Sequence, residues 1–341
     1  MTSTSHEVPD LTPAQERLAT AALALSAFAL NLNTVVFGAL QPFLKNQPCL
    51  PNEDSMKWLV GGAAAGSAVG ALVMGPVADR IGRKRPFLAG MLAFAVLSLL
   101  HLAAPSFAMM FALRVLAGAA VGVAYGSASA LAASLVPYHR RGRTMGTFTA
   151  GMFLAVPLGL PVAVECAKHG YWQAIFVLQA VVAIAGVTFA MRALPAEGGV
   201  GNWVSPWRIV QRPPVRYALA AIALHNGSFF TTVQLATRWL DESRIVLKDQ
   251  QGYLWIGLGL VSAAGSFALG RVADLVGKRN FVLGSSVVLL LCFGLLDERM
   301  DRTTMLLIAL ILALTAAART GPLQALTSGL VPAHELGTVM G

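Results

Sequence analysis

The sequence predicts an all-α protein that crosses a membrane many times, and its composition is the first reason. Of the 341 residues, 56% are hydrophobic and only 12% are charged, whereas soluble domains average about 45–50% apolar and about 25% charged residues. The mean hydropathy of +0.66 shows the same bias. This composition excludes a soluble enzyme, a disordered chain and a disulfide scaffold, and it leaves a polytopic membrane protein.

The second reason is a series of long apolar stretches. A transmembrane helix needs about 20 mostly apolar residues, and ten stretches qualify: 18–44, 58–78, 86–104, 107–136, 144–166, 172–191, 217–240, 253–272, 281–296 and 305–331. A polar stretch rich in proline and glycine, 192–216, separates the sixth from the seventh and reads as a linker. The predicted organisation is a tail over 1–17, a six-helix bundle over 18–191, the linker, and a four-helix bundle over 217–341.

The third reason is the placement of the 25 lysines and arginines. If the N-terminus is cytoplasmic, 15 of them fall on the inner side, seven on the outer side, and three, Arg114, Arg238 and Arg319, within spans. This ratio fits the positive-inside rule, so the net charge of +9 reports topology and not nucleic-acid binding. The first 17 residues carry three acids against Arg17, which is the wrong charge for a signal peptide. We therefore expect a multi-pass protein of the cytoplasmic (inner) membrane.

The chain also matches itself at an offset of 195 residues. Residues 75–84 lie over 270–279, and residues 135–146 lie over 330–341, with no gap between the two matches. Convergence between cytoplasmic loops would explain the cations that the two segments have in common. It would not explain why both segments carry an aspartate at the same place, Asp79 and Asp274. Six spans, an even number, separate the copies, so the halves are parallel repeats. Transporters often use such repeats and bind substrate between them near the midplane.

The repeated loop resembles the signature of the major facilitator superfamily, Gly-x-x-x-Asp-x-x-Gly-Arg-Lys/Arg. The first copy matches at Gly75, Asp79, Gly82, Arg83 and Lys84, and the second at Gly270, Asp274, Gly277, Lys278 and Arg279. In the fourth span Arg114 and Gly118 also match the family pattern. The antiporter pattern of the fifth helix is matched poorly, since Val156 and Pro161 depart from it beside Gly151, Pro157 and Gly159.

The resemblance implies a fold of six plus six helices, of which this sequence holds six plus four. We expect a fragment that stops where the eleventh helix would begin. In the family, the loop around Asp79 latches onto the start of that helix, so we expect Asp79 to lack its partner here. The repeat-related latch, Asp274 against the start of the fifth helix near Thr144, is expected to be intact. The alternative is that both loops only anchor the topology.

Substrate-cavity candidates follow from the helices that line the cavity in this family, the first, fourth, seventh and tenth. Charged residues inside a membrane are costly and therefore point to function, although a structural pairing would also hold an arginine. His225 could carry a proton or could be a packing residue. No carboxylate lies at mid-depth, which favours an anionic or neutral solute. The candidates are Asn31, Asn33, Arg114, His225, Asn226, Gln234 and Arg319.

The resemblance implies a monomeric secondary active transporter of a small organic solute, with alternating access and proton-coupled efflux. The alternatives are uptake of an organic or inorganic anion and a non-transporting receptor or assembly factor on the same scaffold. No catalytic constellation, metal-spaced cluster or phosphate loop is present, so neither an enzyme nor a cofactor is expected. The expected partners are the solute, protons and the lipid bilayer.

The charge distribution yields a topology prediction. A periplasmically active reporter fused after Arg212 should be inactive, because that residue falls in an inner segment, and the same reporter fused after Arg299 should be active. Enzyme assays on intact cells measure both fusions. Activity after Arg212 would contradict the predicted orientation.

Overall fold

The computed structural model of the chain describes residues 11–39, 55–195, 205–243, 248–296 and 301–341; the side chains at 36–39, 229–243 and 248–251 lie outside that description. Every regular element in these ranges is helical. Nine helical segments in them are long and apolar enough to cross a membrane, one for each predicted span except 217–240. The prediction of an all-α polytopic membrane protein is confirmed.

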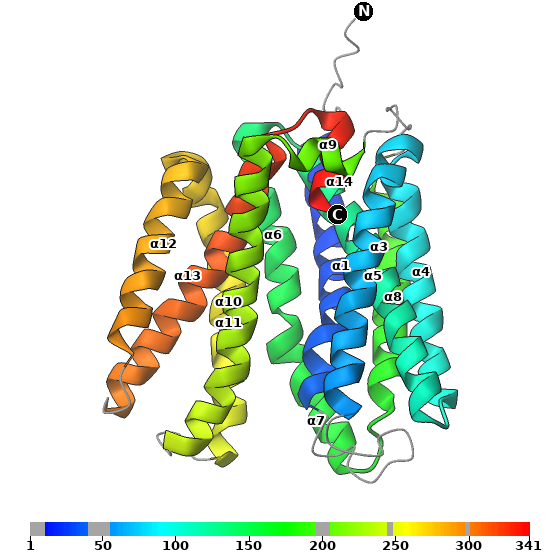
Figure 1. Cartoon of the computed structure of the whole chain (residues 1–341), viewed down its shortest axis with the longest axis vertical. Helices are drawn as coiled ribbons and strands as arrows, with labels where there is room; N and C mark the ends of the chain where they lie inside the picture. Colours follow the sequence, from blue (N-terminus) through cyan, green and yellow to red (C-terminus); the bar gives the residue numbers. More distant parts are fainter. Residues whose placement is uncertain (1–10, 40–54, 196–204, 244–247, 297–300) are drawn as a thin grey trace, which may run out of the picture.

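The helices follow the predicted spans in order, and Figure 1 shows them by label. The first six spans correspond to α1 (Pro13–Ala39), α3 (Ser55–Ile81), α4 (Lys84–Leu100), α5 (Phe107–Ser134), α6 with α7 (Arg141–Phe153 and Leu160–Lys168) and α8 (Ala174–Ala193). The last four correspond to α10 (Pro213–Ser243), α11 (Lys248–Val276), α12 (Lys278–Leu295) and α13 (Arg302–Ser328). Two short helices remain, α9 (Pro206–Val210) before α10 and α14 (Leu336–Met340) near the C-terminus.

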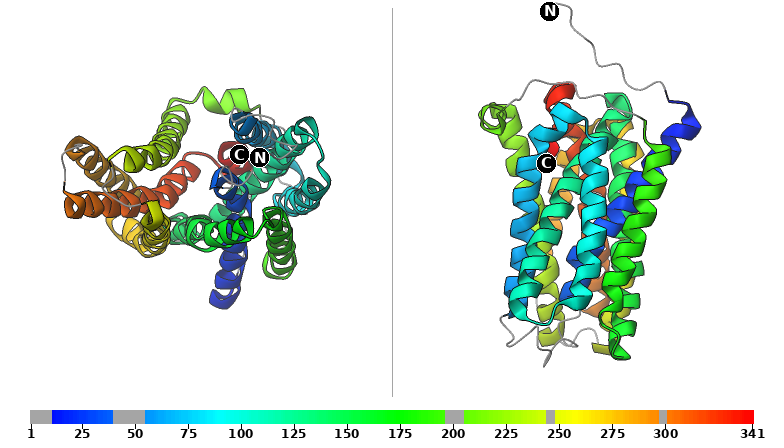
Figure 2. Two further views of the ribbon diagram at one scale, coloured as in Figure 1. Left: turned by 90° about the horizontal axis from the view of Figure 1, so that it is seen from below. Right: turned by 90° about the vertical axis from the view of Figure 1, so that its right-hand side faces the viewer.

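The helices form two groups that lie side by side (Figures 1 and 2). The first group is α1 and α3 to α8, and the second, by position in the chain, is α10 to α14. Between the groups, α6 packs against α11 and α13, and α14 packs against α3 and α5. Both α9 and α14 lie at one end of the bundle, the upper end in Figure 1, which we call the latch end.

The fifth span is not one continuous helix as predicted. A π-helical turn, η3 (Ala155–Gly159), interrupts it between α6 and α7. Pro157 lies inside this turn and has no backbone N–H to donate to the preceding turn, which is a common cause of such interruptions. The widened turn packs against α11, where Gly259 leaves room for Val156 and Pro157.

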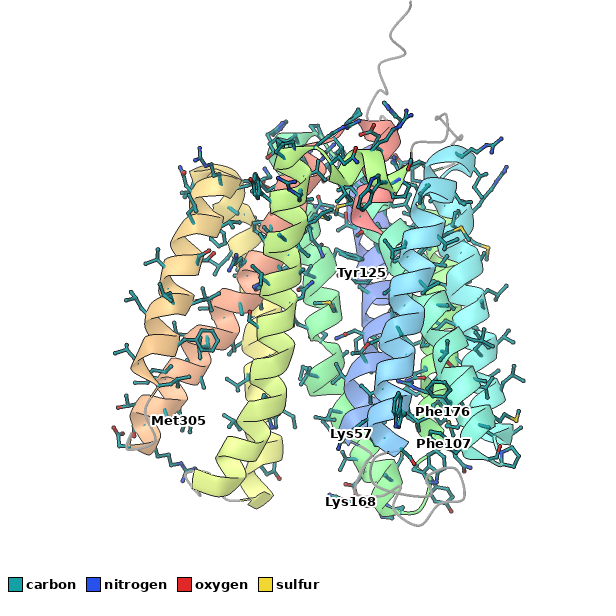
Figure 3. The ribbon with its side chains drawn as sticks, in the orientation of Figure 1. Lys57, Phe107, Tyr125, Lys168, Phe176 and Met305 are labelled. Carbon is teal, nitrogen blue, oxygen red and sulfur yellow. The ribbon has the colours of Figure 1, made fainter. Side chains whose placement is uncertain are left out.

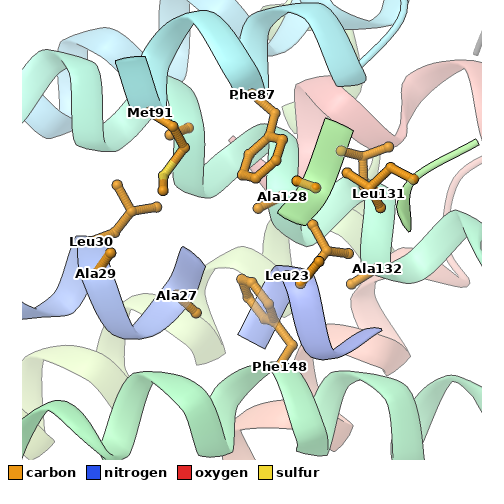
Figure 4. Close-up of a cluster of buried hydrophobic side chains, with 14 of the residues drawn as sticks. Leu23, Ala27, Ala29, Leu30, Phe87, Met91, Ala128, Leu131, Ala132 and Phe148 are labelled. Atoms are coloured by element: carbon orange, nitrogen blue, oxygen red, sulfur yellow. The ribbon is translucent and has the colours of Figure 1, made fainter. Parts of the chain in front are cut away.

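The core of the first group combines alanines with larger aliphatic and phenylalanine side chains from α1, α4, α5, α6 and α8. Figure 4 shows Leu30 and Met91 meeting between α1 and α4, and Phe148 of α6 approaching Leu23 of α1. These side chains are almost completely buried. Because lipid is as apolar as leucine, membrane helices associate through such close packing and not through a hydrophobic driving force.

The closest helix pair of the first group is α3 against α5. A Cβ added at Gly66 or Gly70 of α3 would overlap a backbone carbonyl of α5, at Val115 and Ala119. The glycines of α5 face α3 in the same way, since a Cβ at Gly118 would overlap the Ala63 carbonyl. The Gly-x-x-x-Gly spacing therefore marks a helix contact and explains these residues structurally.

Two glycines of α3 provide a matched test of this contact. Gly66→Ala should lower the free energy of unfolding by about 1–3 kcal/mol, because the added methyl group overpacks against α5. Gly61→Ala is the control, since no atom lies within 4 Å of a Cβ at that position. Thermal unfolding in detergent should show a lower midpoint for the first variant only, and equal midpoints would contradict the close approach.

Candidate functional site: the latches and the central face

The carboxylate of Asp79, near the end of α3, is buried and binds the backbone at the start of α14. It accepts hydrogen bonds from the N–H groups of Gly337 at 2.7 Å and Thr338 at 2.8 Å, and from the Thr338 hydroxyl at 2.8 Å. The expectation that Asp79 lacks its partner is therefore wrong. The reason is that the helix starts at Leu336, so the chain already contains the N–H groups that the carboxylate needs.

Asp274, in the second half of the chain, makes the equivalent contact with the first half. Near the end of α11, its two carboxylate oxygens accept the N–H groups of Gly142 at 2.9 Å and Arg143 at 2.8 Å, at the start of α6. The contact lies one to two residues before Thr144, near which it was expected. The offset of 195 residues carries each donor and acceptor of one latch onto its counterpart in the other.

Each latch carboxylate has a cation four residues further along the chain. Arg83 lies 3.2 Å from Asp79, and Lys278 lies 2.7 Å from Asp274, both measured nitrogen to oxygen. Both cations are themselves buried and reach the opposite group: Arg83 donates to the carbonyl of Ala333, and Lys278 lies 4.5 Å from the centroid of the Tyr138 ring. Each buried charge is thus both paired and hydrogen-bonded or stacked, as burial of charge requires.

Glycines allow the two backbones of each latch to approach. A Cβ at Gly75 would lie 2.7 Å from the Gly337 carbonyl oxygen, and a Cβ at Gly270 would lie 2.6 Å from that of Gly142. No side chain fits in either place. The remaining glycines of the signature, Gly82 and Gly277, have φ values of 90° and 93°; they turn the chain between α3 and α4 and between α11 and α12, in a region that favours glycine.

The last two signature cations differ in role. Lys84 donates to the carbonyls of Met191 and Leu194 at the end of α8, within the first group. This contact places a cation at a helix C-terminus, where unpaired carbonyls attract positive charge. Arg279 is exposed at the start of α12.

Three of the expected cavity residues are bonded inside the first group. Asn31 donates to the carbonyl of Met152 at 2.8 Å. The guanidinium of Arg114, which is 1% exposed, donates to the side-chain oxygen of Asn33 at 2.6 Å and to its carbonyl at 3.2 Å. The structure therefore brings Asn33 and Arg114 together as one buried polar pair between α1 and α5.

The expected cavity residues of α10 do not share one environment. His225 is buried, and its Nε2 lies 3.2 Å from the hydroxyl of Thr320 in α13. Asn226, the next residue, is exposed. The side chain of Gln234 lies outside the described residues.

Arg319 lies on the side of α13 that faces away from α6. Gly321 and Ala317 make the contact with α6, and two residues along a helix correspond to a rotation of about 200°. The repeat-related residue of the first group, Ala124, packs on Gly90 of α4 and not across the contact between groups. Among the described residues, the buried Nε of Arg319 has no hydrogen-bond partner. On that side Arg319 interacts electrostatically with His225 of α10, another of the expected cavity residues.

The sequence analysis missed two polar contacts that join the groups. The Nε2 of Gln324 on α13 donates to the hydroxyl of Tyr125 on α5 at 3.3 Å, and the hydroxyl groups of Thr149 and Ser266 hydrogen-bond between α6 and α11. Figure 3 shows Tyr125 nearer the latch end than Lys57. A polar residue within an otherwise apolar span was the available signal, but it does not say which face of the helix bears the residue.

Two further ion pairs hold the latch end. Glu335, directly before α14, pairs with Arg212, and Arg140, directly before α6, pairs with Glu16 at 2.9 Å. Among the described residues, no three His, Cys, Asp or Glu side chains are placed to hold a metal ion.

Comparison with known proteins decides the family. A family model described as Major Facilitator Superfamily matches residues 20–341. The chain belongs to this superfamily. Its fold is that of two solved superfamily structures, the human organic anion transporter MFSD10 (TETRAN) and the proton:xylose symporter XylE bound to 6-bromo-6-deoxy-D-glucose. Both have a TM-score of 0.74 and cover 97% of this chain, and they are 18% and 15% identical to it; the matches span 89% and 85% of those chains.

Curated relatives from the superfamily are membrane transporters. The chain is 28% identical over 269 residues to the uncharacterized MFS-type transporter YceJ of Bacillus subtilis, and 29% identical over 234 residues to the 3-(3-hydroxy-phenyl)propionate transporter of Escherichia coli. These matches cover 77% and 64% of this chain, and 68% and 56% of the relatives. A third, the gentisate transporter of Corynebacterium glutamicum, is 26% identical over 173 residues, which are 49% of this chain and 38% of that relative.

The latch geometry predicts the effect of removing one charge. In Asp79→Asn the amide keeps one acceptor oxygen but loses the second acceptor and the pairing with Arg83, so the contact with α14 should weaken. Ser129, buried in α5 and 3.4 Å from the Met340 carbonyl, reports on that contact. A cysteine at Ser129 should react with a thiol reagent several-fold faster in the Asp79→Asn variant.

The control is Glu165→Gln, the same change at an exposed carboxylate in α7. It should leave the labelling rate of the cysteine unchanged. Equal rates in all three proteins would show that Asp79 does not hold α14 in place.

Proposed function

We propose that this chain is a secondary active transporter that moves a small organic solute across the membrane by alternating access. The observation that carries the proposal is the pair of repeat-related latches, each joining the first group to the second at the latch end. A rocking motion of two bundles needs contacts that form and break between them at one end. Two carboxylates that bind backbone N–H groups across the contact are contacts of that kind.

The latch end is the predicted cytoplasmic end, because the cations assigned to the inner side gather there. The contact between the groups continues from the latches through Thr149 and Ser266 to Val156 and Gly259. We therefore interpret the structure as an outward-facing state with its inner side closed. The Tyr125–Gln324 hydrogen bond then lies on the closed side of the path of the solute.

The names of the relatives favour a polar organic solute. Two of them transport the aromatic acids named above, and a third is the arabinose–proton symporter of Escherichia coli, 31% identical over 172 residues, which are 50% of this chain and 36% of that relative. We propose a small organic acid as the first solute class, a sugar as the second, and a proton as the coupling ion. The symporter favours uptake over the efflux expected from the sequence. Asn31, Arg114, Tyr125 and Gln324 are the candidates for contact with the solute.

Flux measurements in proteoliposomes test this function. Gentisate, 3-(3-hydroxyphenyl)propionate and arabinose are offered with and without a pH gradient, to protein-containing and empty vesicles. Uptake of one of them should accelerate when the outside of the vesicles is acidified. It should be slower when the inside is the more acidic side. The absence of any protein-dependent flux in either direction would favour the receptor or assembly role instead.

A further inference from the structure

The start of α14 is held by an ion pair from the segment just before α10. The Arg212 guanidinium donates to both carboxylate oxygens of Glu335, with Nη2 to Oε1 at 2.9 Å. The Glu335 side chain is 4% exposed and that of Arg212 is 44% exposed. The hydrogen bond to Glu335 raises the pKa of the Arg212 guanidinium above its ordinary value, so the arginine stays charged.

The same segment also packs against α14 through apolar side chains. Ile209 of α9 and Val215 of α10 form a small buried cluster with Val339 of α14. Together, the ion pair and this cluster attach α14 to the residues that lead into the second group.

Glu335 stands at a position where its charge affects the latch. It is the residue before α14, and the N–H groups that Asp79 binds follow two and three residues later. Two carboxylates close to one helix start repel each other unless each has its own cation. Arg83 forms an ion pair with Asp79, and Arg212 forms one with Glu335. Loss of Arg212 would therefore leave a buried negative charge beside the latch carboxylate.

The first group holds the start of α6 in the same way with the charges reversed. Glu335 corresponds to Arg140 at the offset of 195, and Arg140 is the residue before α6. Its guanidinium binds Glu16 near the start of α1 at 2.9 Å. Arg212 corresponds to Arg17, the neighbour of Glu16. The two copies of the repeat thus keep an ion pair at this place: the residue before the helix changes from Arg140 to Glu335, and its partner shifts by one position, from Glu16 to the counterpart of Arg17.

We propose that Arg212 and Glu16 are positioning residues for the latches: their ion pairs with Glu335 and Arg140 hold the two backbone segments that Asp79 and Asp274 bind. Each pair joins residues of one half of the repeat, so neither pair ties the halves together directly. The pairs act on alternation only through the geometry of the latch. This inference rests on the proposed alternating access, and the readout below needs no solute.

Distances between spin labels at the latch end test the role. The native cysteines Cys49, Cys166 and Cys292 are replaced by serine, and labels are attached at Arg85 and Asn280, which are exposed and related by the repeat. Pulsed electron spin resonance then reports the closed and open populations. Arg212→Glu should raise the open-to-closed ratio about ten-fold, because breaking a buried pair leaves its partner uncompensated.

Charge exchange separates this role from a general loss of stability. The double variant Arg212→Glu with Glu335→Arg restores opposite charges in the order found in the first group, and it should return the ratio to near the wild-type value. Arg208→Glu is the control, since it makes the same charge change at an exposed residue of α9 and should leave the ratio unchanged.

The outcomes are distinguishable. If Arg212→Glu leaves the distances as in the wild type, or if the folded double variant opens as far as the single one, the positioning role is overturned. If the wild-type distance stays constant at every pH and with every solute tested, the alternation itself fails, and with it the proposed function.

Discussion

Two carboxylates that bind the backbone of the opposite half are the interaction on which the closed end of this molecule depends. The first N–H groups of any helix lack partners within that helix, and where they are buried from water the protein has to supply the acceptors. Asp79 and Asp274 satisfy two such groups each, at the starts of α14 and α6. Because these hydrogen bonds run to a charged acceptor, they are stronger than bonds between neutral groups.

The other contacts at the latch end are needed because these two carboxylates are shielded from water. Arg83 and Lys278 compensate them, and Gly75 and Gly270 leave room for the approaching backbone. Within the first group, by contrast, α3 and α5 are joined by carbonyl-to-glycine contacts with no charge at all. Between the halves, these charged hydrogen bonds are added to close packing through small residues, such as Gly146 against Gly270 and Gly321. Directional bonds are fully lost over a small separation, which suits a contact that opens and closes.

Particular residues show how much of the structure could be predicted from the sequence. The spans were predictable because each is a long apolar stretch, and the acid and glycines of the two loops were predictable because the repeat displays them twice. Arg319 shows the limit. Its depth along the helix followed from counting residues, but the side of α13 that bears it did not, since that side depends on which helix α13 packs against. Tyr125 and Gln324 were missed for the same reason.

Asp79 shows a second limit. The start of α14 falls in a short polar stretch near the end of the chain, where hydropathy does not report a helix of five residues. The repeat was the available signal, because the offset of 195 lays Gly337 and Thr338 over Gly142 and Arg143, just before the predicted fifth span. The ion pairs at Arg212 and Arg140 were not predicted because the repeat does not align them: Glu335 lies over Arg140, but Arg212 lies over Arg17 and not over its neighbour Glu16.

The amino-acid sequence was enough to predict a helical membrane protein built from two parallel copies of one unit, with a cationic loop in each copy. Those properties depend on composition, periodicity and repetition, which are local in the chain. The tertiary structure was needed to show which carboxylate binds which helix start, which polar side chains lie between the halves, and which side of α13 bears Arg319. Those properties depend on the rotation of each helix about its axis and on its neighbours, and a difference of two residues turns a side chain to the opposite face.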